Sequence, residues 1–229
     1  MKVQALELNT VHVHHLGLAL DDQAPTVATA LLSDEERLTA AYFRHARHRD
    51  RFIAGRGLVK QLLASYTNTA PDALEFRWNA KGKPALTSAD GQRELFFNYS
   101  HSADHAICAV THIGPIGADV EQVQAWDDLR ELERLVFTTE EIKLLEELAT
   151  SERDLQFFRL WTHKEALVKA TGEGLSLAPE SFGVDLEQAK LMPGRSESCE
   201  WRFTDVSTSP QWPAAIAVAS EDYTVLQFS

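Results

Sequence analysis

Alternating apolar and polar residues near the start of the chain predict two β-strands, over residues 3–8 and 11–20. Ser33 stands three residues before Glu36, a capping-box signature that predicts a helix running to about Phe43. Apolar residues at helical spacing predict a longer helix from about Asp50 to Tyr66. Four short apolar runs then predict strands over residues 74–78, 95–100, 106–111 and 116–121.

The second half of the chain repeats this order of elements. Helices are predicted over residues 127–136, 139–149 and 152–170, the second behind the capping pair Thr138 and Glu141 and the third ending near Gly172. Strands are predicted over residues 182–186, 201–206, 214–219 and 223–228. The pattern favours an α+β fold of two similar halves, residues 1–113 and 114–229, related by a pseudo-twofold with the site in the cleft between them. A likeness this weak between halves also arises by chance.

Length and composition allow one large domain or two small ones. No apolar run approaches the roughly 20 residues of a membrane helix, and the N-terminus lacks the apolar core of a signal peptide. We therefore expect a cytoplasmic protein with no membrane partner. Cys108 and Cys199 lack the spacing of a zinc site, and we expect both to be reduced thiols.

The net charge of -12 argues against nucleic acid as a partner, but the acidic excess is confined to one half. Residues 1–113 hold 12 Lys/Arg and 12 Asp/Glu, whereas residues 114–229 hold 10 and 22. Within the neutral half, the stretch from Arg44 to Lys60 carries six Lys/Arg and the single acid Asp50. This stretch is either a local anion site or a solvated basic helix.

Three carboxylates stand at positions where no local rule requires them. Asp119 and Glu121 alternate along the predicted strand 116–121 and so share one side of it. Glu165 shares a helical face with Trp161 and Lys169. Carboxylates brought together repel one another unless a cation lies between them, and oxygen ligands alone suit Mg²⁺ and a phosphate substrate. The alternative is that the Asp119 and Glu121 pair is a solvated surface.

Basic and polar residues upstream could bind an anion. Lys81 and Lys83 lie in a Gly/Pro turn, and Asn98, Ser100 and His101 end a predicted strand. Taken singly, each of these is more typical of a solvated turn or an ordinary strand end. A serine hydrolase is rejected, because Ser100 and His101 are adjacent and point to opposite faces of the strand, and no GxSxG elbow is present.

Four motifs in order carry a resemblance to a known family: GKP at 82–84, FNYSHS at 97–102, GADVE at 117–121 and WTHKEALVK at 161–169. Together they resemble the signature set of the phosphopantetheinyl transferases of the surfactin-synthetase (Sfp) type. The resemblance implies transfer of the phosphopantetheine arm of coenzyme A to a serine of an apo acyl or peptidyl carrier protein, with release of 3′,5′-ADP. It also implies a chain of two similar halves, and we expect a monomer.

The resemblance implies a role for each matching position. Asp119, Glu121 and Glu165 would be the Mg²⁺ ligands, with Lys169 on the pyrophosphate. The remaining matches are coenzyme contacts at Arg51, Lys83, Ser100 and His101, of which the last two would lie at the nucleotide end, and supporting roles for Trp161 and Lys164, with Lys164 also a candidate for phosphate contact. The proton of the attacking serine could pass to Glu165 directly, or through metal-bound water oriented by Glu121.

One departure from the family pattern concerns the 3′-phosphate of the coenzyme. The best-known members place two lysines toward it from the first capped helix, and this chain has Glu36 and Thr39 there. Arg37, Arg44 or Arg47 could substitute.

The carrier surface is less defined than the coenzyme site. The basic stretch 44–60 and the loop around Trp126 are both candidates for docking a carrier, although Trp126 could equally cap the core between the halves. Two other functions stay open. One is a metal-dependent hydrolase of coenzyme A or related nucleotides, and the other is a non-catalytic relative that binds carrier proteins.

Overall fold

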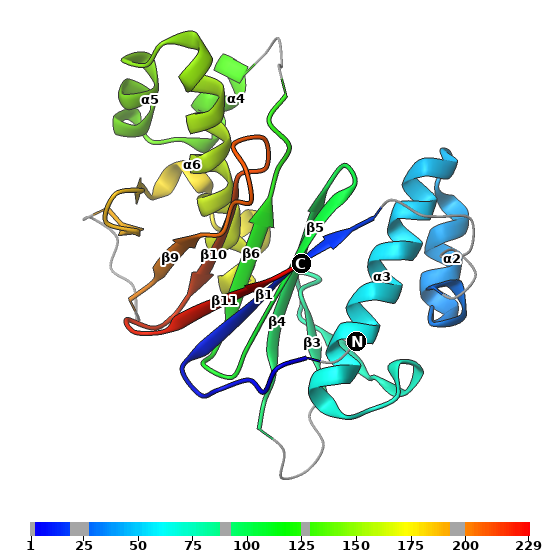
Figure 1. Ribbon diagram of the computed structural model, residues 1–229. Helices are drawn as coiled ribbons and strands as arrows, with labels where there is room; N and C mark the ends of the chain where they lie inside the picture. Colours follow the sequence, from blue (N-terminus) through cyan, green and yellow to red (C-terminus); the bar gives the residue numbers. More distant parts are fainter. Residues whose placement is uncertain (1–2, 19–27, 88–92, 125–128, 193–199) are drawn as a thin grey trace.

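The computed structural model describes residues 3–18, 28–87, 93–124, 129–192 and 200–229. Two β-sheets lie at its centre, and a 22-residue helix covers the outer face of each (Figure 1). The first sheet has the order β11-β1-β5-β4 and the second β6-β10-β9-β8-β7. These mixed layers confirm the predicted α+β class.

The first sheet belongs largely to the N-terminal half. Its strands are β1 (Thr10–Gly17), β4 (Phe96–Ser102), β5 (His105–Thr111) and β11 (Thr224–Phe228). The strand β11 comes from the end of the chain and pairs in parallel with β1, while β5 pairs antiparallel with both β1 and β4. Helices α2 (Asp34–Tyr42) and α3 (Ala46–Thr67) and the hairpin β2 (Phe76–Trp78) and β3 (Pro84–Leu86) accompany this sheet.

The second sheet is made by the C-terminal half. Its strands are β6 (Ile116–Val120), β7 (Val184–Asp185), β8 (Lys190–Leu191), β9 (Arg202–Asp205) and β10 (Ala214–Val218). The helices of this half are α4 (Leu129–Val136), α5 (Thr139–Glu146) and α6 (Thr150–Thr171), and α6 packs along β6 and β10. Short 3₁₀ turns lie at Pro71–Ala73, Gly174–Ser176 and Pro179–Ser181.

Three apolar clusters stack these layers. The first joins α3 to one face of the first sheet, through residues such as Leu62 and Cys108. The second joins the two sheets face to face, with Val13 and Ile107 on one side and Ala118 and Ile216 on the other. The third joins α6 to the outer face of the second sheet. Because side chains alternate along β6, those that do not enter the cluster between the sheets face α6 instead.

Both predicted capping boxes form. The Ser33 hydroxyl accepts a hydrogen bond from the Glu36 amide, and the Glu36 carboxylate accepts one from the Ser33 amide. Thr138 and Glu141 make the same reciprocal pair at the start of α5. Helix α6 ends where predicted, since Gly172 takes a left-handed conformation with φ of 70°.

The strand predicted over residues 3–8 is wrong. These residues belong to no strand, and Val3 and Leu6 instead pack against the cluster beneath α3. Their apolar pattern reflects burial in a covering segment, which period alone does not distinguish from a strand. Within the described residues, none of the helices combines the length and the apolar character needed to span a membrane.

Candidate active site

A close approach of α6 to β6 brings the predicted site residues together. Gly117 makes this possible, because a β-carbon there would overlap the carbonyl oxygen of Ala166 in α6. Asp119, two residues along the strand, therefore faces the same helix. Glu165 and Lys169 lie one turn apart on α6, and Lys169 reaches across to Asp119.

Asp119 is the central carboxylate of this contact. Its Oδ1 lies 2.5 Å from Lys169 Nζ and accepts a hydrogen bond of 2.8 Å from Ser100 Oγ on β4. Lys169 also donates to Ser100 Oγ at 2.8 Å. The side chain of Asp119 is 3% exposed, and its Oδ2 has no hydrogen-bond partner among the described residues. One buried acceptor is thus left over for a further ligand.

Glu121 and Glu165 flank this carboxylate. Ser102 Oγ donates to Glu121 at 2.7 Å and in turn accepts from the Gln122 amide. Burial, and then the charge of Asp119, raise the pKa of Glu121 to about 7, while Ser102 and Lys169 act in the opposite direction. Burial and the charge of Asp119 also raise the pKa of Glu165, and the charge of Lys169 lowers it by less. The carboxylates are therefore electrostatically coupled.

The carboxylates are not arranged as a finished metal site. No three His, Cys, Asp or Glu side chains within the described ranges lie close enough to hold one ion. Lys169 forms an ion pair with Asp119 and neutralises its charge. A metal bound by Asp119 would therefore have to displace the ammonium of Lys169 from its Oδ1 or use the free Oδ2.

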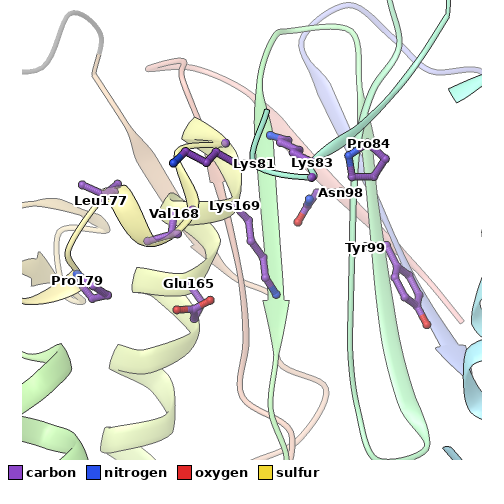
Figure 2. A pocket seen from close by; sticks show the side chains of 13 residues that line it. Lys81, Lys83, Pro84, Asn98, Tyr99, Glu165, Val168, Lys169, Leu177 and Pro179 are labelled. Carbon is purple, nitrogen blue, oxygen red and sulfur yellow. The ribbon is translucent and has the colours of Figure 1, made fainter. Parts of the chain in front are cut away.

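A cavity of about 340 Å³ opens beside these residues. The turn 81–84 lines it on one side and Glu165, Val168 and Lys169 line it from α6 (Figure 2). The rest of the wall includes the apolar residues Leu177 and Pro179 and the polar residue Asn98. A second cavity of about 330 Å³ is lined by residues of α3 and β4 and again by Lys169. Lys169 therefore stands at a boundary shared by two cavities.

The basic turn is fixed to the end of α6. Lys83 Nζ donates to the carbonyl oxygens of Ile116 at 3.0 Å and Ala170 at 2.8 Å, and burial lowers the pKa of Lys83 to about 8. Asn79 donates to the carbonyl of Gly172 at 2.9 Å and accepts from two amides of its own turn. These bonds hold Lys81 and Lys83 in the wall of the first cavity.

Lys164 lies outside both cavities. It is 1% exposed, and Nζ lies 2.7 Å from Glu141 Oε2 while donating to the carbonyl oxygens of Pro179 and Phe182. These three acceptors match its three N–H groups. Trp161 lies about one helical turn before Lys164 on α6. Its ring stacks on Phe157 and packs into the apolar cluster around α4 and α5. Both side chains tie α6 to its neighbours.

Arg51 and His101 lie on the α3 side of the site. Arg51 Nε lies 2.6 Å from Asp104 Oδ1, and Arg47 holds the other oxygen of Asp104 at 2.8 Å. His101 lines the second cavity. Partial burial lowers the pKa of His101, and Lys169, Arg51 and Arg56 lower it further. The positive field that acts on His101 comes from both α3 and α6.

The sequence of this chain matches known protein families and known proteins. Residues 21–113 match the family model of the 4′-phosphopantetheinyl transferase N-terminal region, and residues 115–219 match that of the 4′-phosphopantetheinyl transferase superfamily. The 4′-phosphopantetheinyl transferase HetI of a Nostoc species is 32% identical over 210 residues, which cover 91% of this chain and 87% of HetI. The chain belongs to the 4′-phosphopantetheinyl transferase superfamily. The resemblance found in its sequence is thereby confirmed.

Other transferases are similar over most of their length. The 4′-phosphopantetheinyl transferase Sfp of Bacillus subtilis strain 168 is 28% identical over 198 residues, 85% of each chain. The human L-aminoadipate-semialdehyde dehydrogenase-phosphopantetheinyl transferase is 25% identical over 215 residues, 86% of this chain and 70% of its own.

Two residues that line these cavities are not singled out by the sequence analysis. Arg56 and Tyr99 both line the second cavity, and Tyr99 also lines the first. Arg56 is hidden in a run of basic residues, and Tyr99 lies inside the FNYSHS motif at a position that reads as core. Trp126 and Cys199 lie outside the described residues, whereas Cys108 is a free, buried thiol at the centre of β5.

Proposed function

We propose that this transferase moves the 4′-phosphopantetheine arm of coenzyme A to a serine of an apo acyl or peptidyl carrier protein, releases 3′,5′-ADP and depends on Mg²⁺. The serine oxygen would form the new bond to the phosphorus that carries the arm, and the bridging oxygen would leave with the bisphosphate. The contact of Lys169 with Asp119 and Ser100, between two cavities, is the observation that supports this most strongly.

Lys169 is the proposed pyrophosphate contact. Its side chain lines both cavities, so a side-chain rotation would move the ammonium from Asp119 to a phosphate oxygen. Its positive charge would then oppose the negative charge that develops on the leaving group. Lys83 and Ser100 would place further donors beside the same substrate, Lys83 from the turn fixed on α6 and Ser100 from β4.

The donor atoms of these residues are of the type that fits a hard divalent cation, and the three carboxylates would have to move closer together to hold one ion. Asp119 keeps a buried oxygen without a partner, and Glu121 and Glu165 supply oxygen ligands of the kind that Mg²⁺ prefers. When bound by these three carboxylates, Mg²⁺ would neutralise charge on the substrate pyrophosphate. Departure of Lys169 toward the substrate would leave Asp119 free to act as a ligand.

The two glutamates have different surroundings. Glu165 lines the first cavity beside Lys169, which supports it as the acceptor of the serine proton. Glu121 follows β6 and is held by Ser102, which supports a positioning role. Arg51 and His101 are proposed for the nucleotide end of the coenzyme, where His101 lines the second cavity.

We assign a different part of the proposed site to each half of the chain. Residues 1–113 would contact the nucleotide, and residues 114–229 would supply the metal and pyrophosphate site. The elements that form the site, α3, β4, β6 and α6, all come from one chain, which supports a monomer. A cytoplasmic location remains part of the proposal.

Lys164 is proposed as support and not as a phosphate ligand, because its ammonium is enclosed by protein acceptors.

Product release distinguishes the candidate functions. The transferase is incubated with coenzyme A and Mg²⁺, with and without apo carrier proteins, and 3′,5′-ADP is measured by chromatography. Transfer predicts release only with a carrier that bears the acceptor serine. Release without carrier would identify a hydrolase instead. Glu121→Ala should abolish release. A non-catalytic relative would release no 3′,5′-ADP even as the wild type, and Glu121→Ala would leave its binding of carriers unchanged.

A further inference from the structure

The second cavity has the character of an anion site separate from the pyrophosphate contact. Its wall consists of two residues of α3, three of β4 and one of α6: Phe52, Arg56, Tyr99, Ser100, His101 and Lys169. Of these, Arg56 and Lys169 are cations, and His101, Ser100 and Tyr99 can donate hydrogen bonds. Lys169 is engaged with Asp119, whereas Arg56 makes no hydrogen bond to a carboxylate among the described residues and can serve this cavity.

Arg56 has donor capacity to spare. Its guanidinium carbon lies 5.5 Å from the centre of the Phe52 ring, a cation–π contact that steers the side chain. Its Nε lies 3.9 Å from Glu36 Oε1, which is beyond hydrogen-bond distance. Within the part of the chain that the structure describes, no acceptor takes a hydrogen bond from Arg56. A guanidinium with unused N–H groups in a cavity suits bidentate binding of a phosphate.

Tyr99 is the second independent sign of a ligand. Tyr99 lines the same cavity, and its Oη is buried and has no hydrogen-bond partner among the described residues. Burial raises the pKa of Tyr99, so the phenol stays protonated and can donate. A buried hydroxyl without a partner costs free energy, which a bound acceptor would recover.

The other basic residues near α2 are already committed. Arg37 donates to the carbonyl oxygens of Leu32 and Ala30, and Arg47 is paired with Asp104. Neither of them nor Arg44 lines the described cavities that contain Ser100 or Lys169. Arg56 also lines a third, smaller cavity next to Glu36, so it reaches the position that the family fills with lysine.

Glu36 does not oppose an anion at this place. Lys60 Nζ lies 2.6 Å from Glu36 Oε2, and the same oxygen caps α2. Lys60 is buried and donates also to the carbonyl of Leu31, so it is held on Glu36. With Glu36 neutralised by Lys60, the charge of Arg56 is available to a ligand.

We propose that Arg56, with Tyr99 and His101, binds the phosphomonoester on the ribose 3′ position of coenzyme A and so takes the place of the family's two lysines. This inference rests on the proposed function, which makes coenzyme A the substrate. Arg56 would set the preference for coenzyme A over dephospho-coenzyme A, which lacks only this phosphate.

Calorimetric binding of these two ligands tests the assignment. The wild type is expected to bind coenzyme A more tightly than dephospho-coenzyme A. In Arg56→Ala, coenzyme A should bind about 10- to 100-fold more weakly, as for loss of a hydrogen-bonded charge pair, and dephospho-coenzyme A should bind as before. Arg44→Ala removes the same charge from a site outside the cavities and should change neither affinity.

Two results would overturn the assignment. One is an unchanged preference in Arg56→Ala, whether both affinities stay the same or both fall equally, and the other is loss of the preference in Arg44→Ala. Circular dichroism checks that the variants fold, and Arg56→Lys, which keeps the charge, should retain part of the preference if Arg56→Ala does not fold. A wild type that shows the preference but transfers nothing to carriers would refute the proposed function and leave the Arg56 assignment standing.

Discussion

Lys169 Nζ lies 2.5 Å from Oδ1 of Asp119, on the opposite side of the junction between α6 and β6. This ion pair places a side-chain cation on a carboxylate that the proposed function assigns to Mg²⁺. The side chain of Lys169 also lines two cavities. Substrate binding and metal binding would therefore be linked, because a phosphate that attracts Lys169 also frees Asp119.

Lys169→Ala should separate the two roles of this residue. Turnover is expected to fall roughly 100- to 1000-fold, as for loss of one preorganised charge donor at a reacting group. In the absence of coenzyme A, the variant should bind Mn²⁺ more tightly than the wild type, because a competing positive charge next to Asp119 is gone. Free Mn²⁺ is measured by electron paramagnetic resonance.

The exposed Lys143 on α5 offers the control for that experiment. Lys143→Ala should change neither turnover nor Mn²⁺ affinity. Weaker Mn²⁺ binding in Lys169→Ala would contradict the idea that Lys169 and a metal compete for Asp119.

Gly117→Ala should disturb both stability and catalysis. The added methyl group would overlap the backbone of α6 at Ala166, which cannot move as a flexible side chain can. We expect a loss of at least about 1–3 kcal/mol in the free energy of unfolding, the usual cost of overpacking, with lower activity in whatever folds. Urea denaturation measures the free energy of unfolding. Gly114→Ala, which meets no atom within 4 Å, should leave both unchanged.

Lys164→Ala should act on stability and not on the coenzyme. It removes one partner of a buried ion pair and leaves the side chain of Glu141, which is 0% exposed, without its cation. Breaking such a pair costs about 3–5 kcal/mol. The folded fraction should still bind coenzyme A with wild-type affinity. A rise in the dissociation constant with unchanged stability would show instead that Lys164 contacts phosphate.

His14 makes the stability of the fold depend on pH. His14 Nε2 and His12 Nδ1 both lie 2.7 Å from Tyr66 Oη, and the His14 ring stacks on Phe228. Burial, and then the charges of His12 and His15, lower the pKa of His14 to about 4. Between about pH 6.5 and 4 the unfolded chain therefore takes up a proton that the folded chain refuses, so stability falls as the pH falls.

The size of this effect can be measured by difference. From about pH 7.5 to about pH 5, His14 alone should remove about 2 kcal/mol from the free energy of unfolding. His14→Gln should lose correspondingly less than the wild type in urea denaturation over this interval, which cancels the contribution of the carboxylates common to both. Equal losses in the two proteins would refute the assignment.

Local signals made most elements of this fold predictable. The capping pairs at Ser33 and Thr138 and the glycine at 172 lie within one helical turn of the ends they mark. The start of α3 was placed four residues late, because its N-cap His45 makes no side-chain capping bond and so leaves no signature. The parallel pairing of β11 with β1 joins opposite ends of the chain, which no local pattern records.

The candidate site was predictable where family motifs mark it and not where distant contacts decide it. Sequence spacing put Glu165 and Lys169 on one face of a helix, but their approach to Asp119 depends on Gly117, on another element. The burial of Lys164 depends on Glu141, which lies on α5. Arg56 differs from Arg37, Arg47 and Arg51 because those three have carboxylate or carbonyl partners in the fold.

The mass of an apo carrier protein after incubation with this transferase, coenzyme A and Mg²⁺ tests the central claim most directly. Mass spectrometry of the intact carrier should show one added phosphopantetheine group with the wild type, and none with Asp119→Ala or with Mg²⁺ removed by a chelator. An unmodified carrier across a panel of acyl and peptidyl carriers, or full modification by Asp119→Ala, would contradict it.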